Sequence, residues 1–339
     1  MPCEWCRYVQ EHVKVKTEPP YQDFWVKGRV LEHGVRECEH RYVPIKGLVL
    51  RLGGKCRVLD FGAGSGYFSV RLASDFPDCK VVAVDDDVNL KKVVKMNGVS
   101  NVEVINSRLN SEEIIGLGKF DVVIAYSVVH HTENPLPTLF SLMYISEHFL
   151  IETPYPDEHR HTHNKDNAVE VYNLIHKFSP RLMCLTPPRR KSSPIDFSGA
   201  KLRPIFLISL KELPPPKPIK LTYAEGGKHA QSTAKLWLVN RWLIFPYVPF
   251  RGSFNLYGEE APVICTWNEP LRLLTDDLEG TTFHYEWSLA WKVRLEKDGE
   301  DVEAYATGLK VNQAEILWKR SLRNHYNVQV GDVFTVSPA

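Results

Sequence analysis

A glycine-rich turn near the start of the chain constrains the fold more than any other feature. Residues 57–69 read RVLDFGAGSGYFS, in which a short apolar run is followed by three glycines at alternate positions and then by a helical pattern. Glycines let the chain turn sharply and let its backbone lie against a ligand that a Cβ would push away. The helix behind such a turn directs unpaired N–H groups at whatever is bound. The stretch predicts a strand, a turn and a helix of an α/β fold, with a ligand at the turn or, alternatively, none.

The spacing and charge of this turn separate two ligand classes. A dinucleotide site usually reads G-x-G-x-x-G after an apolar strand, whereas here the spacing is G-x-G-x-G and Asp60 comes just before the turn. A carboxylate there would repel a pyrophosphate and attract an ammonium group. Nineteen residues after Gly66, an apolar run over 80–84 ends in Asp85, which is placed to accept hydrogen bonds from a ribose diol. These features disfavour an NAD-dependent oxidoreductase.

At this point the chain resembles the class I S-adenosylmethionine-dependent methyltransferases, whose first motif has this form and whose cofactor has an ammonium, a sulfonium, a ribose and no phosphate. Phe120–Tyr126 looks like the fourth strand of that fold, and SVVHHT at 127–132 is similar to a signature of methyltransferases that act on small molecules. Strands five, six and seven fit 148–152, 181–186 and 203–209. The resemblance implies an α/β fold with a Rossmann-like doubly wound sheet of seven strands. The last strand would be antiparallel and lie between strands five and six.

Two groups within this superfamily look nearest in short motifs. The tRNA wobble-uridine carboxymethyltransferases have strings similar to VVHHTENPL at 128–136 and LIETP at 150–154, and the polysaccharide chain-terminator methyltransferases have one similar to GYFS at 66–69. Strings this short do not identify the substrate. Residues 125–128 read AYSV where amino-methylating nucleic-acid enzymes usually have N/D-P-P-Y/F, which disfavours N-methylation of adenine or cytosine. The sequence does not decide whether the methyl acceptor is a small molecule, a glycan or RNA.

The resemblance also implies a set of residues that bind S-adenosyl-L-methionine. The methionine end would lie on the glycine turn, the ribose on Asp85 and the adenine beside Ser107. The full set is Asp60, Gly62, Ala63, Gly64, Gly66, Tyr67, Asp85, Asp86, Ser107 and Tyr126. A non-catalytic adenosyl-binding scaffold and an RNA-binding module remain the alternatives to an enzyme.

Two histidines, His130 and His131, are the candidate catalytic residues, because they follow the strand that faces the transferred methyl group in this family. A neutral imidazole can take the proton from an attacking hydroxyl. With an ordinary pKa of about 6.5, it would make the rate fall below that pH. Alternatively, the histidines only pack, and methyl transfer depends on in-line positioning alone.

Composition shifts along the chain predict four segments. They are an N-terminal extension at 1–40, an S-adenosylmethionine-binding methyltransferase domain at 41–212, a Pro-rich linker at 213–233 and a β-rich accessory domain at 234–339. The linker begins with LPPPKP, which favours a stiff, extended boundary. Within the second segment, a short helix is expected at 47–52 before the first strand.

The last segment holds six of the eight tryptophans. Asp298-Gly299 predicts a hairpin turn between 293–295 and 302–305. A helix is expected over 312–323, because Ile316, Leu317 and Arg320 stand at helical spacing. The tryptophans are either a stacking platform for bases or sugars or simply part of a core.

Charge is uneven along the chain, although the net charge is only +1. Between Lys177 and Arg241, 13 Lys or Arg residues stand against three acids, and Arg189, Arg190 and Lys191 form a basic cluster. A basic rim near the strand ends would attract a phosphate-bearing acceptor such as RNA. The alternative is an ordinary solvated loop.

A zinc site is conceivable near the N-terminus, where Cys3 and Cys6 have knuckle spacing and Cys38 and His40 could complete four ligands. The second pair has atypical spacing and Cys3 lies at the chain end, so no metal is expected.

The composition indicates an ordinary globular protein of two domains. The chain of 339 residues is 43% hydrophobic and 24% charged, and it contains no apolar run of the roughly 18 residues that a membrane helix needs. Its first residues lack the pattern of a signal peptide. Seven cysteines, an odd number, favour reduced thiols in a cytoplasmic protein.

Overall fold

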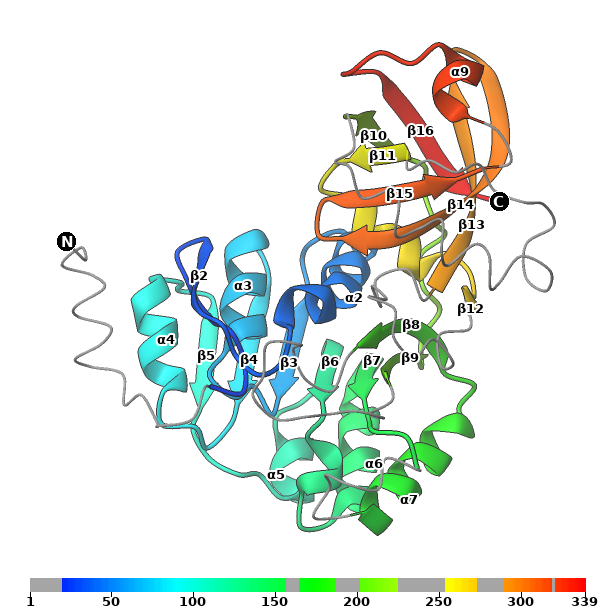
Figure 1. The fold of residues 1–339 in the computed structure, drawn as a ribbon. Helices are drawn as coiled ribbons and strands as arrows, with labels where there is room; N and C mark the ends of the chain where they lie inside the picture. The colour runs from blue at the N-terminus through cyan, green and yellow to red at the C-terminus, as the bar shows by residue number, and fades with distance from the viewer. Residues whose placement is uncertain (1–19, 157–164, 187–201, 225–253, 273–288, 319–320) are drawn as a thin grey trace. The chain divides into compact units, whose positions relative to one another are not determined.

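The computed structural model describes residues 20–156, 165–186, 202–224, 254–272, 289–318 and 321–339 (Figure 1). The chain divides into two compact units. The first comprises Met1–Cys38, Gly53–Pro180 and Pro187–Glu212, and the second comprises Glu39–Leu52, Arg181–Thr186 and Leu213–Ala339. The four segment boundaries expected from the sequence stay a prediction.

The expected Rossmann-like sheet is present, with seven strands in the order β5-β4-β3-β6-β7-β9-β8. The strand bounds are β3 Arg57–Phe61, β4 Lys80–Val84, β5 Val102–Ile105, β6 Phe120–Tyr126, β7 Ser146–Glu152, β8 Arg181–Thr186 and β9 Arg203–Ser209. Strands β3 to β7 pair in parallel, and β9 runs antiparallel to β7, with Leu150 opposite Leu207. The predicted antiparallel last strand, inserted between strands five and six, is therefore confirmed.

The chain order creates a switch point in the middle of this sheet. From β3 the chain proceeds outward to β4 and β5 and then returns to β6 on the other side of β3. Ligands of open α/β sheets bind outside the carboxyl ends of the strands at such a point. The glycine turn directly follows β3, so it lies at this position.

The helices of the first unit begin and end where the sequence gives local signals. Their bounds are α3 Tyr67–Asp75, α4 Leu90–Asn97, α5 Ser111–Gly116, η1 Val129–His131, α6 Pro135–Ile145 and α7 Lys165–His176. Asn110 caps α5, because its side chain accepts from the N–H groups of Glu112 and Glu113 while Glu113 accepts from Asn110 N–H. Helix α4 ends at Gly98, whose φ of 69° lies in the left-handed region.

Residues 20–37, which we call the N-terminal strap, include a hairpin of β1 Phe24–Val26 and β2 Arg29–Glu32. The strap closes on itself where the N–H groups of Val35 and Arg36 donate to the carbonyls of Pro20 and Tyr21, at 2.9 and 3.0 Å. It is also bound to α4, because Asn97 accepts from Lys27 N–H and donates to the Trp25 carbonyl. The extension expected at 1–40 is therefore in part a folded piece of the first unit.

The second unit contains a closed antiparallel β-barrel. Its elements are α2 Cys38–Arg51, β10 Ile219–Tyr223, β11 Phe254–Tyr257, η2 Ala261–Thr266, β12 Leu271–Arg272, β13 Leu289–Lys297, β14 Glu300–Lys310, β15 Gln313–Leu317, α9 Leu322–Tyr326 and β16 Val333–Pro338. The strands pair in the order β13-β14-β15-β11-β10-β16, and β16 pairs back to β13. Closure removes the exposed edges that an open sheet would have. Strand β10 lies inside the stretch 213–233 that the composition marks as a linker.

Two local predictions for this unit have opposite outcomes. The hairpin is confirmed, since Asp298 and Gly299 take φ values of 56° and 83° between β13 and β14. The helix over 312–323 is wrong, because Gln313–Leu317 forms β15 and pairs with β11 and β14. Residues 314–318 are all buried, and a short, fully buried run has no periodicity that separates strand from helix.

Helix α2 is longer than the expected 47–52, and its second half packs tightly within the second unit. A Cβ on Gly47 would lie 2.3 Å from the carbonyl oxygen of Pro262. Arg51 donates to the carbonyl of Thr266 and, at 3.0 Å, to that of Pro214. The glycine is therefore a packing residue of this helix.

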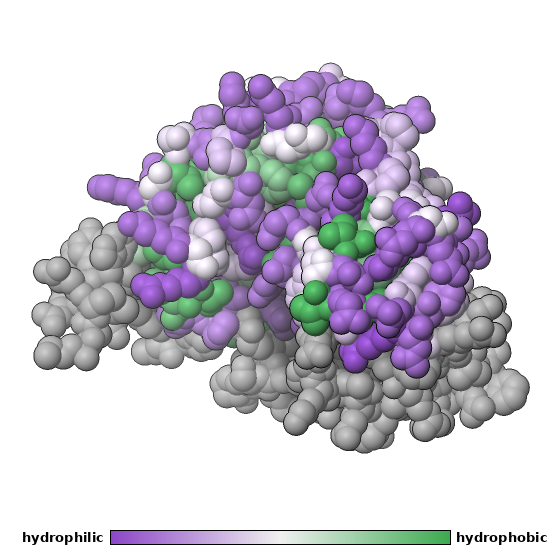
Figure 2. Space-filling model, turned by 90° about the horizontal axis from the view of Figure 1, so that it is seen from above, coloured by the Kyte–Doolittle hydropathy of each residue, from purple (hydrophilic) through white to green (hydrophobic). Residues whose placement is uncertain are grey.

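The surfaces of the described residues are mostly hydrophilic on the face that Figure 2 shows, where hydrophobic residues form small separate groups. Among the described residues, no helix combines the length and the hydrophobicity that a membrane crossing requires.

Candidate functional site

All three glycines of the turn after β3 have left-handed backbone conformations. Gly62, Gly64 and Gly66 have φ values of 77°, 57° and 92°. The turn is fastened to β4, because the N–H groups of Gly62 and Ala63 both donate to the Val84 carbonyl, at 2.9 and 3.0 Å. A Cβ on Gly62 would come within 2.5 Å of Val128, which follows β6. The turn is thus held in place by both neighbouring strands and tolerates no larger residue at Gly62.

Asp60 lies beneath the turn rather than at its surface. It is 2% exposed, and one carboxylate oxygen accepts from the hydroxyl of Ser69 on α3 at 2.5 Å. This hydrogen bond ties the end of β3 to the helix behind the turn.

Asp85 lies at the end of β4 and connects the glycine turn to the next loop. Its Oδ2 accepts from Gly64 N–H at 2.7 Å, and its Oδ1 accepts from Asp87 N–H at 2.9 Å. Partial burial raises the pKa of Asp85, and these two hydrogen bonds oppose that shift. Each carboxylate oxygen has a second lone pair, so both can still accept hydrogen bonds from a ligand.

A cavity of about 470 Å³ opens at the carboxyl ends of the central strands. The expected site residues that line it are Gly62, Asp85, Asp86, Ser107 and His131. The expected residues that do not line it are Asp60, Ala63, Gly64, Gly66, Tyr67, Tyr126 and His130. This volume is in the range of small-molecule sites.

The remaining lining was not expected from the sequence. Hydroxyl, amide and charged side chains supply much of it, together with a few apolar ones; these residues are Phe61, Val84, Arg108, Leu109, Asn110, Ser111, Glu113, Val128, Thr132, Glu133, Asn134 and Thr138. Phe61 and Val84 end β3 and β4, and the others follow β5 and β6. Their position in the sequence could have indicated them, since loops at the carboxyl ends of parallel strands meet at one edge. The cavity is therefore hydrophilic along the loops that follow these strands.

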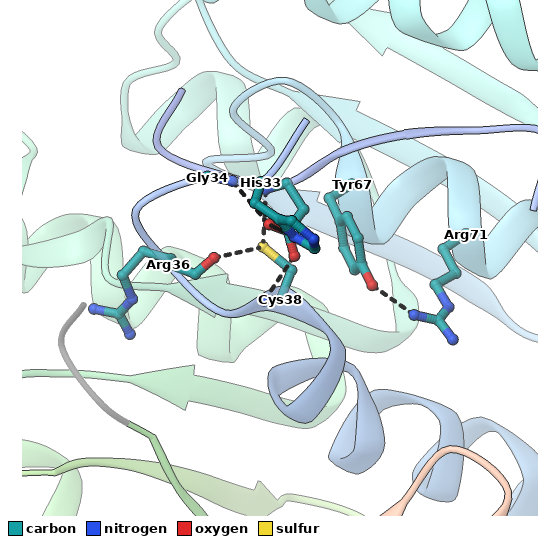
Figure 3. Close-up of polar contacts among 7 residues, drawn as sticks. His33, Gly34, Arg36, Cys38, Tyr67 and Arg71 are labelled. Atoms are coloured by element: carbon teal, nitrogen blue, oxygen red, sulfur yellow. Dashed lines mark hydrogen bonds and ion pairs between the residues drawn. The ribbon is translucent and has the colours of Figure 1, made fainter. Parts of the chain in front are cut away.

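Tyr67 and Tyr126 are packed around Phe68. Tyr67 is 1% exposed and receives a hydrogen bond on its hydroxyl from Arg71 (Figure 3). Phe68 makes edge contacts with both tyrosine rings, at centroid distances of 5.3 and 5.4 Å. These aromatic side chains support the turn from behind.

The two candidate catalytic histidines have different environments. Their rings lie 4.1 Å apart, and His131 lines the cavity whereas His130 is buried. Neither ring nitrogen of His130 has a hydrogen-bond partner among the residues that the structure describes. Desolvation by burial, with smaller contributions from His131 and Arg203, lowers the pKa of His130 to about 3. The expected pKa near 6.5 is therefore wrong for this residue, and His130 stays neutral at physiological pH.

A buried polar cluster that could not be expected from the sequence lies at the carboxyl ends of β6 and β7. Glu152 receives hydrogen bonds from Arg36 of the strap and from Ser127. Arg203 of β9 donates to the Ser127 hydroxyl at 3.2 Å. Ser127 has a φ of 55°, which a non-glycine residue adopts only when its surroundings impose it. The cluster fastens the strap to the strand ends beside the cavity.

Several other expectations fall on residues that the structure does not describe. They are the basic cluster Arg189, Arg190 and Lys191 and the cysteines Cys3 and Cys6. Cys38 and His40 are both buried, and the described residues contain no group of three potential metal ligands.

The tryptophans of the second unit behave as core wherever the structure describes them. Trp267, Trp291 and Trp318 are 5%, 3% and 7% exposed. They are not an accessible stacking platform.

Comparison with known proteins finds a family match over part of the first unit. Residues 58–145 match a model described as a methyltransferase domain. The release factor glutamine methyltransferase of Escherichia coli strain K12 is 34% identical over 56 residues, which are 15% of this chain and 20% of that protein. The chain thus spans about a fifth of the length of the curated relative that it matches.

Solved structures with similarity to this chain include WbdD, at 20% identity, a TM-score of 0.47 and coverage of 75% of this chain and 65% of that one. Another is an S-adenosylmethionine-dependent methyltransferase from Aquifex aeolicus, at 20% identity, a TM-score of 0.36 and coverage of 51% and 94%. Residues 58–145 thus match a methyltransferase domain, and the strand order and the glycine turn around them are those of the class I, S-adenosylmethionine-binding type.

Proposed function

We propose that the protein transfers a methyl group from S-adenosylmethionine to a small, hydrophilic acceptor. The observation that carries the proposal is the cavity at the switch point of the sheet, which brings Gly62, Asp85 and Ser107 together. These residues fit an adenosyl group, because Asp85 presents carboxylate oxygens at the cavity and Gly62 borders it without a side chain.

The cofactor residues have separate roles in this proposal. Asp85 accepts hydrogen bonds from the ribose hydroxyls and holds the glycine turn through Gly64 N–H. Asp86 and Ser107 border the cavity beside it and contact the ribose and adenine. Asp60, fixed by Ser69 under the turn, attracts the ammonium group at the amino-acid end.

The acceptor enters on the side of the segment that follows β6. His131, Thr132 and Asn134 line that side, and they supply hydrogen-bonding groups for a polar acceptor. When bound, the cofactor would supply an electrophilic methyl group on sulfur; an acceptor lone pair would form the new bond to carbon, and the sulfur would keep the electron pair of the broken bond. His131 orients the acceptor and takes its proton, and in-line alignment provides most of the rate. His130, buried and neutral, holds His131 in position by ring contact.

The test is the formation of S-adenosylhomocysteine from S-adenosylmethionine in the presence of fractionated acceptors. Small-molecule, glycan and RNA fractions are supplied separately, and product is measured by mass spectrometry. Turnover with the small-molecule or soluble glycan fraction supports the proposal. Turnover with the RNA fraction alone would show that the acceptor is RNA and not a small hydrophilic molecule. Tight cofactor binding without turnover in any fraction would favour a non-catalytic adenosyl-binding scaffold.

A further inference from the structure

Gln22 of the N-terminal strap lies directly on the glycine turn, although it is more than 40 residues away from it in the sequence. The side chain is 4% exposed. A Cβ on Gly64 would lie 3.1 Å from the amide carbon and oxygen of Gln22 and 3.2 Å from its nitrogen. The amide group of Gln22 is therefore in close contact with the glycine turn, on which the family resemblance places the methionine end of the cofactor.

The orientation of this amide follows from the donors around it. Gln22 Oε1 accepts from Tyr67 N–H, the first N–H of α3, at 3.3 Å and from the Ser65 hydroxyl at 3.4 Å. A backbone N–H can only donate, so the oxygen must face α3 and the nitrogen must face away from Tyr67 N–H. Gln22 Nε2 makes no hydrogen bond with any residue in the described part of the chain, and it remains a donor beside Gly64.

The position of Gln22 is fixed by the rest of the strap. The two backbone hydrogen bonds that close the strap involve Pro20 and Tyr21, the residues just before it. Gly34 packs against its backbone so closely that a Cβ there would lie 2.3 Å from the Gln22 carbonyl carbon. The strap backbone on both sides of Gln22 is thus held before any ligand binds.

Asp23, the next residue, is the centre of the polar contacts that hold the strap; its partners Gly34, Cys38 and His33 are labelled in Figure 3. Its carboxylate accepts from Gly34 N–H at 2.8 Å and from Cys38 N–H at 3.4 Å, and His33 lies 3.4 Å from it. Asp23 is 2% exposed, so its hydrogen bonds to the two backbone N–H groups are shielded from water. A side chain presented from such a rigid support loses little conformational freedom when it binds a ligand.

From these contacts we infer that Gln22 is a binding residue for the α-carboxylate of the adenosyl amino acid. Gln22 Nε2 donates to that carboxylate, while Oε1 keeps its hydrogen bonds to the turn. The positive end of α3, a helix of nine residues, adds to the attraction of an anion at this position. The inference rests on the proposed function, since it assumes that the adenosyl group occupies the cavity.

The experiment compares two ligands that differ only in this carboxylate, S-adenosylmethionine and decarboxylated S-adenosylmethionine. Their dissociation constants are measured by calorimetry for the wild type, Gln22→Glu, Gln22→Ala and Gln329→Ala. Gln22→Glu retains an oxygen for Tyr67 N–H and replaces only the N–H donor by a negative oxygen. Gln329 lies on the exposed surface of the second unit and is the matched control.

We expect the loss of affinity caused by a Gln22 substitution to depend on whether the ligand has the carboxylate. Gln22→Glu should weaken the binding of S-adenosylmethionine at least tenfold. The affinity for the decarboxylated ligand should be unchanged or higher. Gln22→Ala should show the same selectivity with a smaller loss, and Gln329→Ala should match the wild type for both ligands.

Equal effects of Gln22→Glu on the two ligands, or no effect on either, would overturn the assignment of Gln22 while leaving the proposed function intact. A wild-type protein that binds neither ligand would instead overturn the proposed function and this inference together. Circular dichroism melting of each variant shows whether a uniform loss of affinity comes from a damaged fold.

Discussion

Replacing Gly62 by alanine should destabilise the first unit for two separable reasons. The residue has a φ of 77°, and a Cβ at this position would lie 2.5 to 2.9 Å from three side-chain atoms of Val128. Gly98, the C-cap of α4, has a similar φ of 69° but no atom within 4 Å of an added Cβ. Gly62→Ala and Gly98→Ala therefore introduce the same backbone strain, but only Gly62→Ala also introduces a steric clash.

The magnitudes follow from these two contributions. An L-residue in the left-handed region costs about 1–2 kcal/mol, which is the whole expected loss for Gly98→Ala. Forcing an extra methyl group into a packed site costs about 1–3 kcal/mol more, so Gly62→Ala should lose about 2–5 kcal/mol. Shortening the opposing side chain in Gly62→Ala/Val128→Ala should recover part of the second contribution but none of the first.

Differential scanning calorimetry is the assay, with the transition of the first unit identified by its shift to higher temperature with S-adenosylhomocysteine. Gly62→Ala should melt clearly below Gly98→Ala, and the double variant should melt closer to Gly98→Ala. Equal melting temperatures for the two single variants would refute the packing of the turn against Val128.

Three further predictions concern charged and polar groups near the turn. Asp85→Ala should weaken S-adenosylhomocysteine binding by about 2–3 kcal/mol in calorimetry, because a charged acceptor is lost. Ser69→Ala should lower the free energy of unfolding by about 1–3 kcal/mol in urea titrations, since buried Asp60 loses a donor. Because the pKa of His130 is lowered to about 3, the native state resists protonation and stability should fall between pH 6.5 and 3, by at most ~1.4 kcal/mol per pH unit. His130→Phe should flatten that slope in acid denaturation, and an unchanged slope would contradict the burial of His130.

The sheet could be predicted from the sequence because its strands are short apolar runs that end in distinctive residues. Arg181–Thr186 and Arg203–Ser209 form strands with the expected bounds, and the antiparallel position of the latter was implied by the family resemblance. The strand pairing of the barrel could not be predicted in the same way. Its strands pair across long separations, as when Ile219 lies opposite Val336, and such pairing depends on tertiary contacts.

The part of the site that could be predicted is local to two strand ends. The glycine turn and Asp85 lie next to each other because parallel strands align their carboxyl ends. Gln22, Arg36 and Arg203 could not be predicted, because they reach the site through the fold of the strap and through β9. No spacing in the sequence connects these residues to the turn.

The central claim is that the cavity at the glycine turn binds an adenosyl amino acid. Calorimetric titration of the purified protein with S-adenosylhomocysteine, and separately with NADH, tests it directly. The account predicts saturable, micromolar binding of S-adenosylhomocysteine that Asp85→Ala weakens, and no binding of NADH. Micromolar binding of NADH without binding of S-adenosylhomocysteine would contradict it.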